Sequence, residues 1–197
     1  MNCSSRLVLL CLVLLLSLGF NGSLLAQTPD FFENYPGGST RTVYEITDGR
    51  LNIPARLTQE IRPTVGGVFE VHSNAQFQGR LDQLDVGLIE LQAKLFGFLT
   101  SEAVRTLLEK VDEVDPIGTV LLPANGQFES DGEENFLGVT VIRGVLRFRD
   151  NPDRRLRLYL TQDKFVPLPP LLVVEDREGG EFSEDFKLEL KEFIRES

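Results

Sequence analysis

Arginines are the residues of this sequence whose types and spacing are best suited to bind something. Four of them alternate with other residues in the stretch 138–161, namely Arg147, Arg149, Arg155 and Arg157. A guanidinium group holds a carboxylate or a phosphate through two parallel hydrogen bonds. The four side chains could therefore bind an external anion, or they could pair with carboxylates of the chain itself. Internal pairing is the simpler interpretation, because charges on an outward sheet face usually serve solvation.

The same stretch predicts a β-hairpin with one buried face, because its apolar residues recur at every second position. The inward residues include Leu146, Phe148, Leu158 and Leu160. Like faces stay together only if the loop holds an odd number of residues, and we predict a loop at 150–154. This register sets Arg147 against Arg157. It also sets Arg149 against Arg155, and like charges directly opposite each other need anions nearby.

Acidic residues cluster just before the hairpin, in a segment that we expect to be a loop at 129–135. Their oxygens could surround Ca²⁺, which accepts carboxylate and carbonyl ligands in loose geometry. The candidate ligands are Glu129, Asp131, Glu133 and Glu134. The segment does not match the EF-hand pattern, so a solvated acidic turn, or a set of partners for the arginines, is the simpler interpretation.

The sequence offers little for catalysis. His72 is the only histidine, and one histidine cannot form a zinc site built from several histidines. The common hydrolase, metalloprotease and phosphate-binding motifs are missing. Two carboxylates could still serve a glycosidase, but a chain with no tryptophan and three tyrosines has few aromatic platforms for a sugar. We expect a protein that is not an enzyme and uses no cofactor, with His72 on an outward sheet face opposite Thr58.

The first 26 residues have the form of a secretory signal peptide, with Arg6 followed by an apolar run at 7–20. The run is shorter than a bilayer requires, and no second long apolar stretch follows it. Both cysteines, Cys3 and Cys11, fall within this segment, so the mature chain would form no disulfide. We expect export to a bacterial periplasm or to the cell exterior, with no transmembrane span after cleavage.

Charge narrows the choice of partners. The chain holds 20 basic and 30 acidic residues, for a net charge of −10. Such a field repels nucleic acid and anionic membrane surfaces, so neither is an expected partner. We divide the chain into a signal peptide at 1–26 and a single β-rich domain at 27–197, which is long enough to bury a core without disulfides.

Further alternating segments predict more strands. They lie at 41–46, 55–62, 68–78, 118–122, 171–174 and 186–191. The segment 81–99 fits both a helix and a strand. We predict a strand at 86–98, since each glycine inside a helix there would cost about 1 kcal/mol. With one helix predicted at 102–112, about eight antiparallel strands suit a mainly β fold, a closed barrel or half-barrel, with a two-sheet β-sandwich as the alternative.

Two parts of the chain carry a family resemblance. Gly67, Phe69 and Val71, together with the stretch LRLYLTQDKFVPLPPLLVVEDREGG and the later FKLEL, resemble an uncharacterised group of exported bacterial β-sheet proteins. At a greater distance they are similar to the half-barrel lipid carriers of the periplasm. The resemblance implies a curved sheet with an apolar concavity, and it carries over no catalytic residue.

Two functional hypotheses follow. In the first, a non-enzymatic exported protein binds a lipid-like or other amphipathic molecule in an apolar interior, with the arginines available to an anionic head group. The apolar contacts would be Phe69, Val71, Phe77, Leu146, Phe148, Leu158 and Leu160. In the second, a structural or interaction module docks a cell-envelope protein through its outer sheet face or an edge strand. An apolar cavity would favour the first hypothesis, and a solid core would oppose it.

Overall fold

The structure is a computed structural model of the chain. It describes residues 35–49, 55–66, 68–78, 91, 93–95, 97–99, 101–166 and 168–196. The chain divides into two compact units, and the second, Pro36 to Ser197, contains every element described below. The predicted signal peptide lies outside the described residues.

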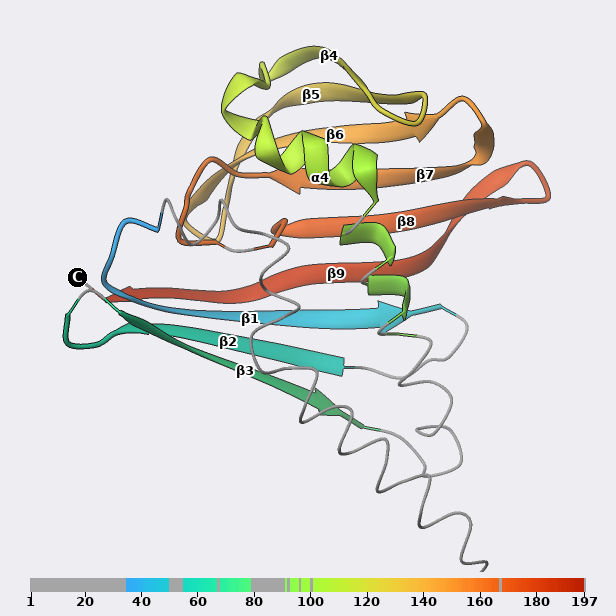
Figure 1. The fold of residues 1–197 in the computed structure, drawn as a ribbon. Coiled ribbons are helices and arrows are strands. Elements are labelled where there is room, and N and C mark those ends of the chain that lie inside the picture. Colours follow the sequence, from blue (N-terminus) through green and yellow to red (C-terminus); the bar gives the residue numbers. More distant parts are fainter. Residues whose placement is uncertain are drawn as a thin grey trace, which may run out of the picture. The chain divides into compact units, whose positions relative to one another are not determined.

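Among the described residues of this unit, nine antiparallel strands form a single sheet (Figure 1). They are β1 (Ser39–Asp48), β2 (Ala55–Pro63), β3 (Phe69–Phe77), β4 (Ile117–Leu122), β5 (Gly126–Phe136), β6 (Val139–Phe148), β7 (Asn151–Leu160), β8 (Leu171–Glu178) and β9 (Glu181–Glu196). Their order is β3-β2-β1-β9-β8-β7-β6-β5-β4. The sheet is therefore open, with β3 and β4 as its edges, and the long β9 joins two groups of sequential strands.

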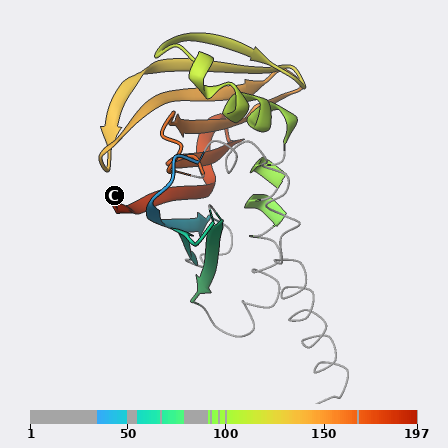
Figure 2. The same cartoon turned by 60° about the vertical axis from the view of Figure 1, so that its left-hand side comes forward.

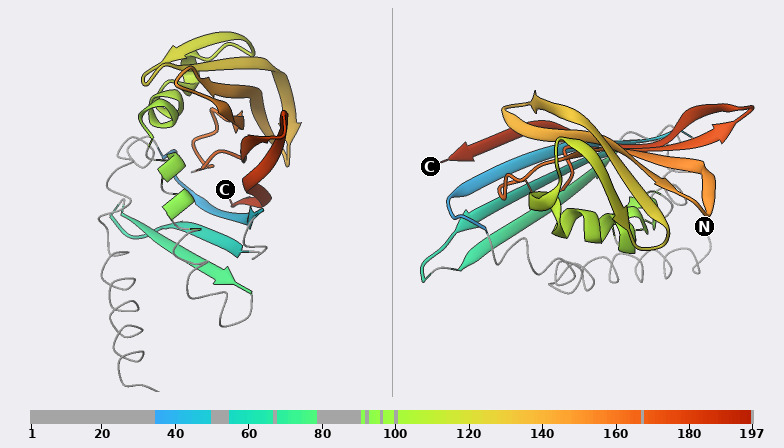
Figure 3. Two further views of the ribbon diagram at one scale, coloured as in Figure 1. Left: turned by 90° about the vertical axis from the view of Figure 1, so that its right-hand side faces the viewer. Right: turned by 90° about the horizontal axis from the view of Figure 1, so that it is seen from above.

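The sheet bends strongly, as the rotated views show (Figures 2 and 3). Register shifts interrupt four of the strand pairs, for example between Ser130 and Gly132 and between Val174 and Glu175. Such irregularities increase the local twist and bend the bulged strand, so they account for part of the curvature. A half-barrel of antiparallel strands, one of the predicted architectures, is confirmed, and the strands that the structure describes form neither a closed barrel nor a β-sandwich.

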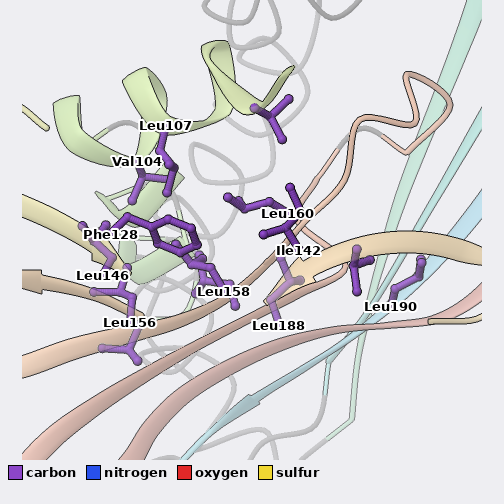
Figure 4. Close-up of a cluster of buried hydrophobic side chains, with 14 of the residues drawn as sticks. Val104, Leu107, Phe128, Ile142, Leu146, Leu156, Leu158, Leu160, Leu188 and Leu190 are labelled. Carbon is purple, nitrogen blue, oxygen red and sulfur yellow. The ribbon is translucent and has the colours of Figure 1, made fainter. Parts of the chain in front are cut away.

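One face of the sheet, called here the inner face, carries the apolar core. The helix α4 (Glu102–Glu109) covers this face with Val104 and Leu107, both completely buried, and the short helix η2 (Val111–Glu113) follows it. The close-up shows these side chains packed towards the inner residues of the strands (Figure 4). Gly144 on β6 lies so close to Phe128 that an added Cβ would sit 2.4 Å from the phenyl ring. The core of this region is therefore filled by side chains.

The predicted strand at 86–98 is wrong for every residue of it that the structure describes. Residues 91, 93–95 and 97–99 are helical, and the remainder of the range lies outside the described residues. Leu91 is only 3% exposed, and Leu95 and Phe98 pack partly buried against the same core. Their spacing of four and three residues is that of one helix face, which outweighs the cost of Gly97.

The hairpin prediction is correct in its faces and wrong in its register. The predicted loop at 150–154 is mostly strand, because the turn consists of Arg149 and Asp150 and β7 begins at Asn151. A register shift beside Phe148 places Arg147 opposite Arg155. Val145, rather than an arginine, faces Arg157. A displacement by two residues preserves the face of each side chain, which explains why the alternation alone could not reveal it.

The acidic segment at 129–135 is not a loop, because all of it lies within β5. Its register shift at Ser130 and Gly132 accommodates Asp131 as the extra residue of a bulge. Carboxylates occur in this strand because arginines of the neighbouring β6 face them, as described below. Cross-strand pairs of opposite charge stabilise such a sheet.

Candidate functional site

The arginine patch, meaning Arg147, Arg149, Arg155 and Arg157, lies on the outer face of the sheet, opposite the core. Glu175 on β8 accepts hydrogen bonds from two of its members, at 2.6 Å from Arg155 Nε and 2.8 Å from Arg157 Nε. Its side chain is only 9% exposed. One nearly buried carboxylate thus bridges two arginines whose stems lie side by side, and charge-assisted hydrogen bonds of this kind are the strong ones.

Further carboxylates on the neighbouring strands complete this pairing. Arg147 pairs with Glu129 on β5, and Arg143 Nη1 lies 3.1 Å from Glu134 Oε2. On the opposite face of β7, Arg154 makes two hydrogen bonds with Asp176, at 2.6 and 2.8 Å, and this contact raises the pKa of its guanidinium. The patch therefore has carboxylate partners within the chain at Arg147, Arg155 and Arg157, while Arg149 lies in the exposed turn.

The acidic residues considered for Ca²⁺ belong to the same network. Glu129, Asp131 and Glu134 lie within ion-pair distance of Arg147 or Arg143. Glu133 is exposed and lines a separate hollow of about 220 Å³. Across the part of the chain that the structure describes, no group of three or more His, Cys, Asp or Glu side chains is arranged to hold a metal ion.

The apolar candidates of the hairpin lie on the other face. Leu146, Leu158 and Leu160 have no exposed surface and form part of the filled core, while Phe148 packs partly buried at its margin. The sheet itself separates them from the arginine patch. A small amphipathic molecule cannot reach both sets at this hairpin.

The inner face of β1–β3 is built differently. Phe69, Val71 and Phe77 are only partly buried there. On the adjacent strands Thr42 Oγ1 and Gln59 Oε1 are buried and make no hydrogen bond, and these two residues face each other directly in the register. Thr42 is 2% exposed. A buried polar atom without a partner is costly and rare, so this pair is a candidate contact for a bound molecule.

The outer face of β1–β3 is hollowed. A hollow of about 400 Å³ is lined by Arg41, Thr58, Glu60, Arg62, His72, Asn74 and Gln76. Glu60 Oε2 accepts a hydrogen bond of 2.6 Å from Arg62, and Arg41 Nη1 donates one of 2.7 Å to Glu192. His72 faces outwards, as predicted, although it lies opposite Glu60 and not Thr58. The lining offers amides, a hydroxyl group and charges of both signs.

A buried ion triad was not foreseen from the sequence. Lys94 Nζ lies 2.7 Å from Asp48 Oδ2 and 3.2 Å from Asp185 Oδ2. Asp48 is 3% exposed and Asp185 is 8% exposed. Buried carboxylates require a cation, so this triad fixes the helical segment that carries Lys94 to the ends of β1 and β9. No motif could indicate it, because 46 and 91 residues separate the lysine from its partners.

Among the residues that the structure describes, no helix has both the length and the apolar character needed to cross a membrane. Neither a protein-family model nor a curated protein matches the sequence. Solved structures do resemble the fold. One is a crystal structure of MucB, with 12% sequence identity and a TM-score of 0.43, covering 89% of this chain and 60% of that chain.

Two further solved structures are similar to this chain. The MucA/MucB complex of Pseudomonas aeruginosa gives 12% identity and a TM-score of 0.38, covering 84% of this chain and 56% of that chain. A DUF1329 family protein from Desulfovibrio piger gives 10% identity and a TM-score of 0.24, covering 85% of this chain and 89% of that chain. This chain thus spans about three fifths of the MucB chain that it matches. The chain is similar to these proteins at a distance only.

Proposed function

We propose that this chain is an exported, non-enzymatic binding protein that holds an amphipathic molecule on the inner face of β1–β3. The unpaired, buried Thr42 Oγ1 and Gln59 Oε1 are the observation that supports the proposal most directly. A hydroxyl or amide group of a ligand would satisfy both atoms, and it would remove the cost of burying them without partners.

The surroundings of this pair suit the apolar part of such a molecule. In the register of β1, β2 and β3, the row formed by Tyr44, Leu57 and Ala75 lies on one side of Thr42 and Gln59. The row containing Ile61 and Val71 lies on the other side. A few polar atoms between apolar walls are typical of small-molecule sites.

The proposal moves the ligand away from the hairpin at 138–161. Leu146, Leu158 and Leu160 are completely buried under α4, so a ligand could reach them only by displacing core side chains. Phe69, Val71 and Phe77 remain as candidate contacts, with Leu57 added. The arginine patch takes no part in this site. Most of its arginines already pair with carboxylates of the chain, and the sheet lies between the patch and the inner face.

Two substitutions on neighbouring positions of β3 test the proposal. Val71→Glu places a charge on the inner face, whereas His72→Glu places the same charge on the outer face one residue later. The probe is a fluorescent long-chain fatty acid, titrated into protein purified from the periplasm of the expression host. We expect binding to wild type and to His72→Glu, and its loss in Val71→Glu. No binding to wild type, or an equal loss in both variants, would refute the proposal.

Native mass spectrometry of the same preparation adds an independent measurement. Co-purifying lipid in the wild type, reduced in a Thr42→Val and Gln59→Leu double variant, is the expected outcome. The mass of the purified chain also reports cleavage after the first 26 residues, which tests export separately from binding.

A second candidate function is the docking of a cell-envelope protein through the outer face. The polar hollow of about 400 Å³ favours it, since its lining combines guanidinium, carboxylate and amide groups. An Asn74→Arg substitution would fill the hollow without touching the inner face. Loss of a cross-linked envelope partner, with unchanged fatty-acid binding, would identify this second function.

A further inference from the structure

We propose that β4 is a self-association edge, at which a second copy of this chain pairs antiparallel about Thr119 and extends the sheet. This inference concerns a region distinct from the ligand face of β1–β3. It rests on three features of β4: its position in the sheet, its lack of charge, and the symmetry of its exposed side chains.

β4 is the last strand of the sheet in the described chain, so one side of its backbone has no neighbouring strand. Natural proteins protect such edges with lysines, prolines or bulges. The sequence of β4, IGTVLL, contains no charged residue and no proline. Its pairing with β5 shows no register shift, so the strand has no bulge. Pro116 and Pro123 flank the strand but do not interrupt it, so the edge of β4 can accept a partner strand.

The exposed side chains of β4 are apolar and face outwards. Ile117 is 79% exposed and Leu121 is 74% exposed. Thr119 lies between them on the same outer face, because side chains alternate along a strand. Val120 and Leu122 point to the core instead, with Val120 partly buried and Leu122 8% exposed.

This pattern is symmetric about Thr119. If two copies pair antiparallel with Thr119 opposite Thr119, then Ile117 of each copy lies opposite Leu121 of the other. Both exposed apolar side chains thus gain an apolar cross-strand neighbour, and the two threonines face each other. Gly118 meets Val120 on the inner face, where a glycine leaves room for the valine.

The charge distribution permits a second copy at β4 more readily than at the other edge of the sheet. The chain carries a net charge of −10, which opposes association of two copies, and this repulsion is weakest where the contact surface itself carries no charge. No charged residues face each other between the two β4 strands. The nearest carboxylates on β5, Glu129 and Asp131, are already paired with Arg147 and Arg143. The opposite edge, β3, carries Glu70 and His72 on its outer face.

A two-fold pairing of this kind is closed. Each copy uses the same strand, so the contact cannot propagate into a filament, and the dimer retains only the polar β3 edges. The interface is narrow, and we therefore expect an equilibrium between monomer and dimer that depends on protein concentration.

Sedimentation velocity over a concentration series measures this equilibrium. We expect a concentration-dependent dimer in the wild type and a monomer in Thr119→Lys, which sets two lysines against each other at the axis. Val65→Lys is the matched control, because Val65 is 97% exposed at the turn between β2 and β3 and lies far from β4 along the sheet. The control should dimerise like the wild type. Circular dichroism verifies that each variant is folded.

Cross-linking tests the register itself, in a chain with Cys3→Ser and Cys11→Ser. Directly opposite residues have Cα atoms about 4.5 to 5.5 Å apart, within the range of a disulfide. Thr119→Cys should therefore form an oxidised dimer. Ile117→Cys alone should not, since its copies would lie about 13 Å apart along the strands. The double variant Ile117→Cys and Leu121→Cys should cross-link again.

Three outcomes would overturn the inference. They are a wild type that stays monomeric throughout the series, a dimer that survives Thr119→Lys, and cross-linking of Ile117→Cys alone that equals that of Thr119→Cys. If β4 binds a different protein while the wild-type chain stays monomeric, the inference is overturned in the same way as by the first outcome.

Discussion

The strands β4–β9 and the strands β1–β3 belong to one sheet, yet they use its two faces differently. In β4–β9 the inner face is filled, with Leu146, Leu158 and Leu160 fully buried beneath α4. The outer face is neutralised by cross-strand arginine and carboxylate pairs. In β1–β3 the inner face leaves two buried polar atoms unpaired, and the outer face contains the larger of the two hollows described above.

The difference indicates that the two parts of the sheet have different roles, one in stability and the other in binding. A filled core and paired charges stabilise a fold, but they leave neither space nor unpaired polar groups to bind a ligand. Unpaired polar atoms and half-buried apolar side chains reduce stability, and binding can recover what they cost. We therefore assign most of the stability to β4–β9 and the proposed ligand site to β1–β3.

The largest expected effect is in the filled core. Leu158→Ala should lower the free energy of unfolding by about 2 to 5 kcal/mol, because Leu158 is fully buried and its removal leaves a cavity. The matched change on the other region, Val71→Ala, should cost about 1 kcal/mol or less, because Val71 is only partly buried. Urea unfolding followed by circular dichroism measures both. Equal losses would remove the contrast between the regions.

The next effect is at the junction of the two regions. Lys94→Met leaves Asp48 and Asp185 without their shared cation, and we expect a loss of about 2 to 3 kcal/mol. That is less than for a fully buried pair, because the lysine side chain is 23% exposed. Thermal unfolding of this variant should separate into two transitions if the triad couples the regions. A single transition at the wild-type temperature would show that the triad contributes nothing.

A smaller effect distinguishes the two outer faces. Glu175→Gln weakens the contact with Arg155 and Arg157, and we expect a loss of about 1 to 2 kcal/mol that diminishes at high salt. Glu60 is the matched control, because it also lies near two arginines but is 28% exposed. Glu60→Gln should cost about 0.5 kcal/mol or less. Urea unfolding measures both losses. A larger loss in Glu60→Gln than in Glu175→Gln would show that the ion pairs of β1–β3 contribute more to stability.

The smallest effect concerns acid stability on β9. Partial burial raises the pKa of Glu189, but hydrogen bonds from Lys187 and Lys191 outweigh it, so the pKa lies below its ordinary value of 4.5. A carboxyl group with a lowered pKa stabilises the folded state above that ordinary value, and the contribution is lost as the pH falls through the lowered one. The Glu189→Gln variant should therefore lose less stability than the wild type on acidification. Parallel curves of stability against pH would contradict this.

Alternation along single strands predicted much of the fold. The inward residues of the hairpin, the outward position of His72 and the helix beginning at Glu102 all follow from local spacing. The register between β6 and β7 did not follow, because a displacement by two residues keeps every side chain on its face. The helix that contains Lys94 was missed because its leucines satisfy two periods at once, and only packing against the core decides between them.

The candidate site was harder to foresee than the fold. Phe69, Val71 and Phe77 could be placed on an inner face from their alternation. That Thr42 and Gln59 would face each other without hydrogen-bond partners depends on how β1 and β2 pair, and no local pattern contains this information. The arginines illustrate the converse, because Glu129 and Glu175 could satisfy them only once β5 and β8 were placed beside the hairpin.

The position of β9 determines the order in which this protein can fold. β1 pairs with β9, and a hydrogen bond between Arg41 and Glu192 spans 151 residues of the chain. The strands β1–β3 thus cannot join the rest of the sheet before β9 is available. Contacts between residues so far apart in the sequence form slowly. The sheet therefore stays incomplete until β9 has left the ribosome.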